Sequence, residues 1–176
     1  MTAKVESLFG IPLWVIEGDL LEGSLDWALD FRNKNPDGVQ MTNQGGYHSK
    51  DVNDEFPFYD HLQERIQTLP RCKVVSIWIN INGQGDYNSI HTHPLIDLSL
   101  VWYLTDNQNT LRLMDPLGDM KHKILRSLDH KNMNTSNLVR ATAGDMVAFP
   151  GFIPHLVEPN REETERVSIA FNLVCP

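Results

Sequence analysis

The 176-residue sequence predicts a mainly β domain, a jelly roll with two N-terminal helices packed on one of its sheets. Three observations support this prediction. Helical periodicity is confined to the first 70 residues, short alternating or β-branched runs fill the rest, and no linker or repeat divides the chain. We expect a single domain over 1–176, in which 1–70 form an N-terminal support and 71–176 form the β core.

The N-terminal support is expected to contain one strand followed by two helices. Residues 7–18 are an apolar run that ends at a glycine, which is typical of a β-strand. Apolar residues in 20–34 recur at helical spacing until the turn sequence NPDG, and a second amphipathic pattern covers 56–69 before a proline. The polar, glycine-rich segment between the two helices is predicted to be a loop.

The β core is predicted from five runs. Residues 72–82 and 165–174 alternate and are rich in β-branched side chains, and 97–106 is strongly apolar. The run 109–116 follows closely enough to be a hairpin partner of 97–106, and 137–151 holds two short strands about a glycine turn. Strands of this number and length favour a closed sandwich or a short barrel.

Charge and cysteine content limit the partners and the compartment. The formal net charge of -8 argues against a nucleic-acid or anionic-membrane surface, and no run approaches the ~20 apolar residues that span a bilayer. The two cysteines, Cys72 and Cys175, form no CxxC motif, so we expect no disulfide framework and a reducing, cytoplasmic location. The oligomeric state is left open.

Three histidines are the strongest candidates for chemistry. His91 and His93 stand two residues apart, so on an extended segment both imidazoles project from one face, as two adjacent metal ligands require. A third ligand is expected from His155, which follows an apolar strand in a proline-bounded loop. A lone loop histidine is usually solvated or structural, and only the combination of the three predicts a metal site.

Arg166 is the next candidate. It lies eleven residues after His155 on the last predicted strand, and Ser168 shares its face of that strand. If that face is interior, the buried guanidinium requires an anion, and a guanidinium with a hydroxyl is a good clamp for a carboxylate. The alternative is that Arg166 faces solvent and pairs with Glu162 or Glu163.

On these residues the chain resembles the iron(II)- and 2-oxoglutarate-dependent oxygenases, and more narrowly a small branch of them that is common in bacteria and phages. The resemblance rests on WININGQGDYNSIHTHP, LSLVWYLTD, LMDP, AGDMVAFPGFIPHLVEPN and RVSIAFN, in this order over roughly residues 74–174. The N-terminal half is similar more loosely, through LFGIPLW and GGYHS. The resemblance implies a double-stranded β-helix, which is a jelly roll.

The resemblance also implies the cofactors and the reaction. Iron(II), 2-oxoglutarate and O2 are expected, with 2-oxoglutarate converted to succinate and CO2 while a C–H bond of a substrate is hydroxylated. His91 and His155 match the metal-binding histidines of the family. Arg166 with Ser168 matches the clamp for the far carboxylate of 2-oxoglutarate, and Tyr103 falls on a strand where such enzymes often place a cosubstrate contact.

The sequence departs from the family at His93, where a carboxylate is usual. Three arrangements follow: His93 ligates in place of the carboxylate, Asp97 reaches the metal, or His91 and His155 work with water. We favour His93, because only the spacing of two residues reproduces the geometry of the usual pair.

Two other functions fit the same residues. One is a cupin-type metalloenzyme that does not use 2-oxoglutarate, because two spacings are similar to the cupin motifs: Gly85, His91, His93 and Asp97, then Gly144, Pro150 and His155. Arg166 favours the oxygenase, since cupins do not in general carry an arginine at that position. The other is a non-catalytic jelly-roll binding domain in which the histidines are structural.

The substrate is the least determined part of the prediction. Candidate contacts are Tyr47 and His48, in the polar loop that could cover the site, and Trp102 on a predicted strand. A short chain leaves little room for large lids, so we expect a small molecule or a peptide or protein side chain as substrate.

Overall fold

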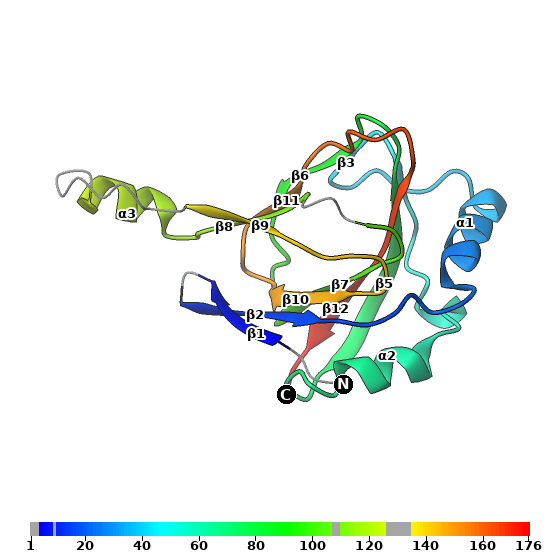
Figure 1. Cartoon of the computed structure of the whole chain (residues 1–176), viewed down its shortest axis with the longest axis horizontal. Coiled ribbons are helices and arrows are strands. Elements are labelled where there is room, and N and C mark those ends of the chain that lie inside the picture. Colours follow the sequence, from blue (N-terminus) through cyan, green and yellow to red (C-terminus); the bar gives the residue numbers. More distant parts are fainter. Residues whose placement is uncertain (1–3, 9, 107–109, 126–134) are drawn as a thin grey trace.

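The structure is a computed structural model that describes residues 4–8, 10–106, 110–125 and 135–176. Within these residues, two antiparallel sheets face each other, and the jelly roll predicted from the sequence is confirmed (Figure 1). Helices α1 (Ser24–Lys34) and α2 (Tyr59–Ile66) lie beside the larger sheet, as expected, and a short 3-10 helix, η1 (Asn53–Glu55), precedes α2.

The larger sheet has seven strands in the order β1-β2-β10-β7-β12-β5-β4. Their bounds are β1 Lys4–Leu8, β2 Ile11–Ile16, β4 Tyr47–His48, β5 Lys73–Asn82, β7 Leu98–Tyr103, β10 Met146–Pro150 and β12 Arg166–Val174. The long strand β12 lies between β5 and β7, with Ser168 opposite both Asn80 and Tyr103. These three strands carry Tyr103, Arg166 and Ser168.

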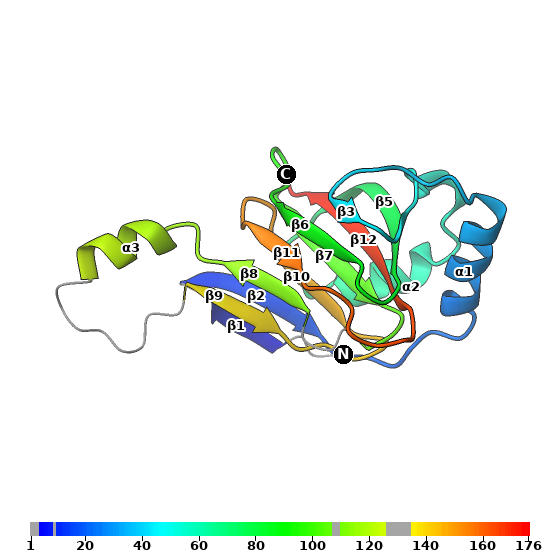
Figure 2. The same ribbon diagram turned by 90° about the horizontal axis from the view of Figure 1, so that it is seen from above.

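The smaller sheet has five strands in the order β3-β6-β11-β8-β9. Their bounds are β3 Asn43–Gln44, β6 Tyr87–His91, β8 Leu111–Met114, β9 Ser136–Val139 and β11 His155–Val157. Between β8 and β9 the chain forms helix α3 (Gly118–Leu125), which projects away from the two sheets (Figures 1 and 2). Strands β6 and β11 are neighbours, and this pairing brings the first and last candidate histidines together.

Alternate residues of the central strands lie in two different environments. On one face of the larger sheet, apolar side chains are buried with Ala28 of α1 and Leu62 of α2. They include Ile77, Ile79, Ile81, Leu100, Trp102, Val167, Ile169 and Phe171. The residues between them point toward the smaller sheet, because successive side chains of a strand alternate between faces. The apolar core between the helices and the larger sheet therefore stabilises one face of this sheet. The opposite face of the sheet can carry the residues of a functional site.

Several local expectations are wrong. The run 7–18 forms two strands, β1 and β2, joined by a turn that contains Gly10 at φ 82°. The sequence does not predict α3, and the loop between the first two helices contains the short strands β3 and β4. Strand β8 does not pair with β7 as a hairpin but with β11 and β9 in the other sheet, and β9 and β10 are also in different sheets.

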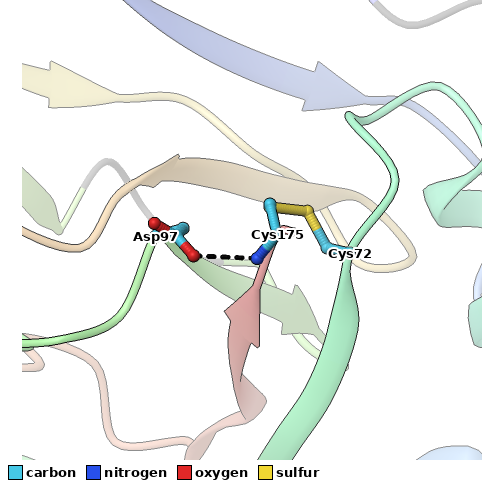
Figure 3. The surroundings of a disulfide bond; sticks show 3 residues. All are labelled: Cys72, Asp97 and Cys175. Atoms are coloured by element: carbon cyan, nitrogen blue, oxygen red, sulfur yellow. Dashed lines mark hydrogen bonds between the residues drawn. A yellow bond between two sulfur atoms is a disulfide. The ribbon is translucent and has the colours of Figure 1, made fainter.

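The expectation of no disulfide framework is also wrong, because Cys72 and Cys175 are bonded to each other (Figure 3). They flank β5 and β12, whose pairing sets Lys73 opposite Val174 and brings the two cysteine Cα atoms to 4.0 Å. Their separation of 103 residues hides this contact in the sequence. The cytoplasmic location stays a prediction, and no helix in the described part of the chain is long and apolar enough to cross a membrane.

Candidate metal and cosubstrate site

A cavity of about 500 Å³ lies between the two sheets. One wall consists mainly of the alternate residues of β5, β7 and β12 that face away from the helices, and the other comes largely from β6, β11 and the loop after His91. The lining residues include three histidines of the predicted metal site and Arg166, together with asparagine, serine and apolar side chains. Among the described residues that line the cavity there is no aspartate or glutamate.

The three predicted metal-site histidines meet at this cavity. His91 ends β6 and lies directly opposite His155, the first residue of β11, with ring centroids 4.2 Å apart. His93 lies in the loop that follows, 5.1 Å from His91 and 5.2 Å from His155 between ring centroids. One ring nitrogen from each residue lies within 4.8 Å of the others, so the three could hold one metal ion.

Backbone hydrogen bonds orient two of these rings. Nδ1 of His91 lies 2.7 Å from the carbonyl oxygen of Ser89, and Nδ1 of His155 lies 2.9 Å from that of Ile153. A carbonyl only accepts, so Nδ1 donates and carries the proton in both rings, which leaves the Nε2 lone pair for a metal. The two histidines therefore use the same device, a carbonyl two residues earlier in the chain.

Burial keeps all three rings in the form that binds metals. It lowers the pKa of His155 to about 3 and that of His93 to about 4, in each case with a further lowering by the neighbouring His91. Burial also lowers the pKa of His91 below its usual value. At neutral pH the three imidazoles are consequently uncharged, and a neutral imidazole is the form of histidine that ligates a metal.

Of the three arrangements considered from the sequence, the geometry favours His93 over Asp97. The backbone N–H of His93 donates to the carbonyl of Gly151 at 2.8 Å, and the indole of Trp78 stacks on its ring at 5.7 Å. Asp97 is not in the cluster, because its Oδ2 accepts a 2.8 Å hydrogen bond from the backbone N–H of Cys175 beside the disulfide (Figure 3). The cupin-like expectation of Asp97 as a fourth ligand is therefore not met.

Arg166 faces the interior of the sandwich. Its side chain lines the cavity and the residue is only 4% exposed, so the alternative of a solvent-facing pair with Glu162 or Glu163 is wrong. Both terminal nitrogens, Nη1 and Nη2, are buried and have no hydrogen-bond partner among the described residues. Burial lowers the pKa of Arg166 to about 10, so the guanidinium is still a cation at neutral pH.

The residues around Arg166 are polar. Ser168, two positions along β12, lines the same cavity and lies opposite Tyr103 and Asn80 in the sheet. Tyr103 also lines the cavity and is buried. A buried guanidinium flanked by hydroxyl and amide groups is suited to a carboxylate, as the sequence predicts.

Two of the three candidate substrate contacts are not in the cavity. Trp102 is fully buried on the helix-covered face and packs against Phe58 and His61. It directly precedes Tyr103, which faces the cavity, and successive side chains of a strand point to opposite faces. Tyr47 packs on the same core cluster and lines a separate surface cavity. His48, the next residue, does line the main cavity.

Sequence reasoning missed several polar residues of the cavity wall, among them Asn80, Ser99 and Asn172. The signal for Asn172 is present in the sequence, since it continues the spacing of two from Arg166 and Ser168. Ser99 and Asn80 carry no comparable signal, because only the strand register shows that they face the same space.

Comparison with known proteins gives one family and a set of similar structures. A family model described as "Putative 2OG-Fe(II) oxygenase" matches residues 76–172, more than half of the chain. A comparison with curated proteins gave no match.

The similar structures share the fold at low sequence identity. HygX from Streptomyces hygroscopicus, with nickel and 2-oxoglutarate bound, has a TM-score of 0.63 and 12% identity over 93% of this chain and 82% of its own. SnoK, a non-haem alpha-ketoglutarate-dependent carbocyclase from nogalamycin biosynthesis, has a TM-score of 0.67 and 12% identity over 93% and 79%. AviO1 from Streptomyces viridochromogenes Tue57 has a TM-score of 0.64 and 13% identity over 94% and 90%.

Proposed function

Because the chain belongs to the family of 2OG-Fe(II) oxygenases, we propose that it is a 2-oxoglutarate-dependent hydroxylase. Its substrate would be a small molecule or a peptide or protein side chain with a C–H bond that reaches the cavity. One observation carries the proposal: three uncharged histidines face the same cavity as a buried arginine whose Nη atoms have no partner in the described part of the chain. The first group suits iron(II), and the second suits the far carboxylate of 2-oxoglutarate.

His91, His93 and His155 would hold the iron, with Nε2 as the ligand atom of His91 and His155. Three protein ligands leave room for 2-oxoglutarate and O2 on the metal. Bound iron and 2-oxoglutarate supply the oxidative chemistry, in which O2 converts 2-oxoglutarate to succinate and CO2 and one oxygen atom enters the substrate. The residues of the chain contribute position, charge and the exclusion of water.

Charge balance makes 2-oxoglutarate a fitting cosubstrate. The three histidines are neutral, so no protein ligand reduces the charge of a divalent ion, and Arg166 adds another positive charge. A dianionic cosubstrate with one carboxylate at the metal and one at Arg166 offsets most of this charge. Ser168 and Tyr103 would donate further hydrogen bonds to the carboxylate at Arg166.

An anaerobic titration tests the proposal. Iron(II) and 2-oxoglutarate added to the protein should give the visible charge-transfer band of a chelated 2-oxoglutarate, and oxygen should then yield succinate. His155→Ala should abolish the band, whereas His61→Ala, at a half-buried histidine against Trp102 outside the cavity, should retain it. A wild-type protein without the band, or a band that survives His155→Ala, would show that the proposed site is not used.

A further inference from the structure

The cavity has a second polar end, far from Arg166. After Arg166 and Ser168, the next cavity-lining residues of β12 with the same orientation are Ala170 and Asn172. A strand rises about 3.3 Å per residue, so the backbone of Asn172 lies roughly 20 Å from that of Arg166 along β12. A five-carbon cosubstrate held between Arg166 and the metal does not span this length, and space remains for a substrate.

Three residues form this second end. In the sheet, Asn172 lies opposite Ser76 of β5 and Ser99 of β7, and all three line the cavity. We call Ser76, Asn172 and Ser99 the Ser-Asn-Ser row. The Asn172 side chain is adjacent to His93, so the row lies beside the histidine cluster.

An apolar row separates the Ser-Asn-Ser row from the arginine end. Two residues closer to the arginine end on each strand, and on the same face of the sheet, lie Trp78, Ala170 and Val101, which are opposite one another. All three line the cavity. A ligand that extends from the Ser-Asn-Ser row toward the arginine end would lie along this apolar row, which suits a short aliphatic chain.

The Ser-Asn-Ser row contains buried polar atoms that the fold does not satisfy. Ser99 is 4% exposed, and its Oγ has no hydrogen-bond partner among the described residues. Oδ1 of Asn172 is also buried and meets no donor in good hydrogen-bond geometry among the described residues, although the Asn172 side chain is close enough to the His93 ring to raise the pKa of that ring. Buried polar groups are normally hydrogen-bonded, so two such atoms in one cavity wall indicate a ligand. The carboxylate clamp at Arg166 does not use either atom.

We infer that the Ser-Asn-Ser row is the substrate subsite, and that it binds an uncharged group which both donates and accepts hydrogen bonds, a carboxamide or an alcohol. This inference rests on the proposed function. Oδ1 of Asn172 needs a donor, while the Ser99 hydroxyl can donate in return. A carboxylate brings no donor to Oδ1, and an ammonium finds no carboxylate among the lining residues.

Four probes of matched length test the subsite: butyramide, 1-butanol, butyrate and butylammonium. Binding to the zinc-loaded protein with 2-oxoglutarate is measured by ligand-detected NMR. Butyramide or 1-butanol should bind at least tenfold more tightly than either charged probe. Equal or tighter binding of a charged probe, or no binding of both uncharged probes, would overturn the inference. If 2-oxoglutarate itself does not bind, the proposed function fails; if it binds and the preference is absent, only the subsite fails.

Two variants locate the preference in the row. Asn172→Asp introduces a carboxylate, so the preferred probe should change to butylammonium, and Ser99→Ala should weaken butyramide binding severalfold. Asn137→Asp, an identical change at an exposed position of β9, should keep the wild-type preference. The thermal midpoint and the 2-oxoglutarate affinity of each variant check its fold, and Ser99→Ala decides the matter if Asn172→Asp does not fold. An unaltered preference in both row variants would contradict the assignment.

Discussion

Two buried arginines differ in their hydrogen-bond partners in this protein. Arg65 of α2 is 1% exposed and donates from Nη2 to the carbonyls of Ile16 and Gly144, at 2.8 and 3.1 Å. Arg166 of β12 is 4% exposed, and neither Nη atom has a partner among the described residues. Backbone carbonyls accept from Nη2 of Arg65, although its Nε is buried with no partner among the described residues. Both Nη atoms of Arg166 lack such partners, and we propose that a ligand provides them.

The surroundings of Arg65 are built around its guanidinium. A Cβ atom on Gly18 would lie 2.6 Å from Cζ of Arg65, so a side chain there would displace the guanidinium. Gly144 has φ 97°, and a Cβ atom on it would lie 2.3 Å from the carbonyl oxygen of Gly18. These two glycines let the backbone close around Arg65. The two arginines are about equally buried, so the proposed ligand role of Arg166 rests on its two terminal nitrogens without partners among the described residues and not on burial alone.

The largest expected effect comes from Arg166→Met. Loss of one partner of a buried charge pair costs about 2–5 kcal/mol, so the affinity of the iron-loaded protein for 2-oxoglutarate should fall by a factor of roughly 30 to several thousand. The free energy of unfolding of the metal-free protein should stay the same or rise, because an unpaired buried cation is removed. Calorimetric titration and urea unfolding measure the two quantities. An affinity for 2-oxoglutarate equal to that of the wild type would contradict the proposed role of Arg166 in binding its carboxylate.

Arg65→Met should have the opposite effect: it should lower the stability of the protein and leave its affinity for 2-oxoglutarate nearly unchanged. It leaves the carbonyls of Ile16 and Gly144 buried without their donor, at a cost of about 1–3 kcal/mol for each unsatisfied group. We expect the free energy of unfolding to fall by about 2–6 kcal/mol, while 2-oxoglutarate affinity stays within twofold in the folded fraction. A variant with wild-type stability but weakened 2-oxoglutarate binding would reverse the assigned roles.

The histidine cluster extends the comparison to pH. Its rings are neutral in the folded protein, with the pKa of His155 at about 3 and that of His93 at about 4, whereas unfolded histidines titrate near pH 6.5. Between these values the unfolded chain binds more protons than the folded one, so the stability of the metal-free protein should fall as the pH drops from about 6.5 toward 4. Urea unfolding across this range measures the slope. His155→Asn should reduce the slope of stability against pH. An equal slope in that variant would argue against His155 as a source of the pH dependence.

The smallest effect is expected for Ser168→Ala. The hydroxyl would supply one hydrogen bond to a carboxylate already held by Arg166, worth about 1 kcal/mol, so 2-oxoglutarate affinity should fall about fivefold. Stability should change by less than about 0.5 kcal/mol. Ser136→Ala, at a hydroxyl that accepts from Arg112 outside the cavity, is the control for 2-oxoglutarate affinity. A loss as large as that of Arg166→Met would mean that Ser168 does more than assist the clamp.

The period of two in a strand explains which site residues could be predicted. It shows that Arg166 shares a face with Ser168, and the pairing of His91 with His155 agrees with the predicted three-histidine set. It does not show which face is covered by helices. Trp102 and Tyr103 are neighbours in an apolar run, and only the packing of α2 against Trp102 assigns Tyr103 to the cavity.

The predictions that failed depend on strands far apart in the sequence. Strand β8 follows β7 but pairs with β11, because successive strands of a jelly roll can belong to opposite sheets. The disulfide between Cys72 and Cys175 follows from the pairing of β5 with β12, which no local pattern contains. The same pairing brings Ser76 opposite Asn172, so the Ser-Asn-Ser row was equally hidden.

NMR of the arginine guanidinium groups tests the role of Arg166 most directly. In the zinc-loaded protein, the Nη signals of Arg166, assigned by their loss in Arg166→Met, should shift and saturate as 2-oxoglutarate is added, while those of Arg65 stay in place. Saturable binding of 2-oxoglutarate that leaves the Arg166 signals unmoved would contradict the claim that this arginine is held in the cavity for the carboxylate of the cosubstrate.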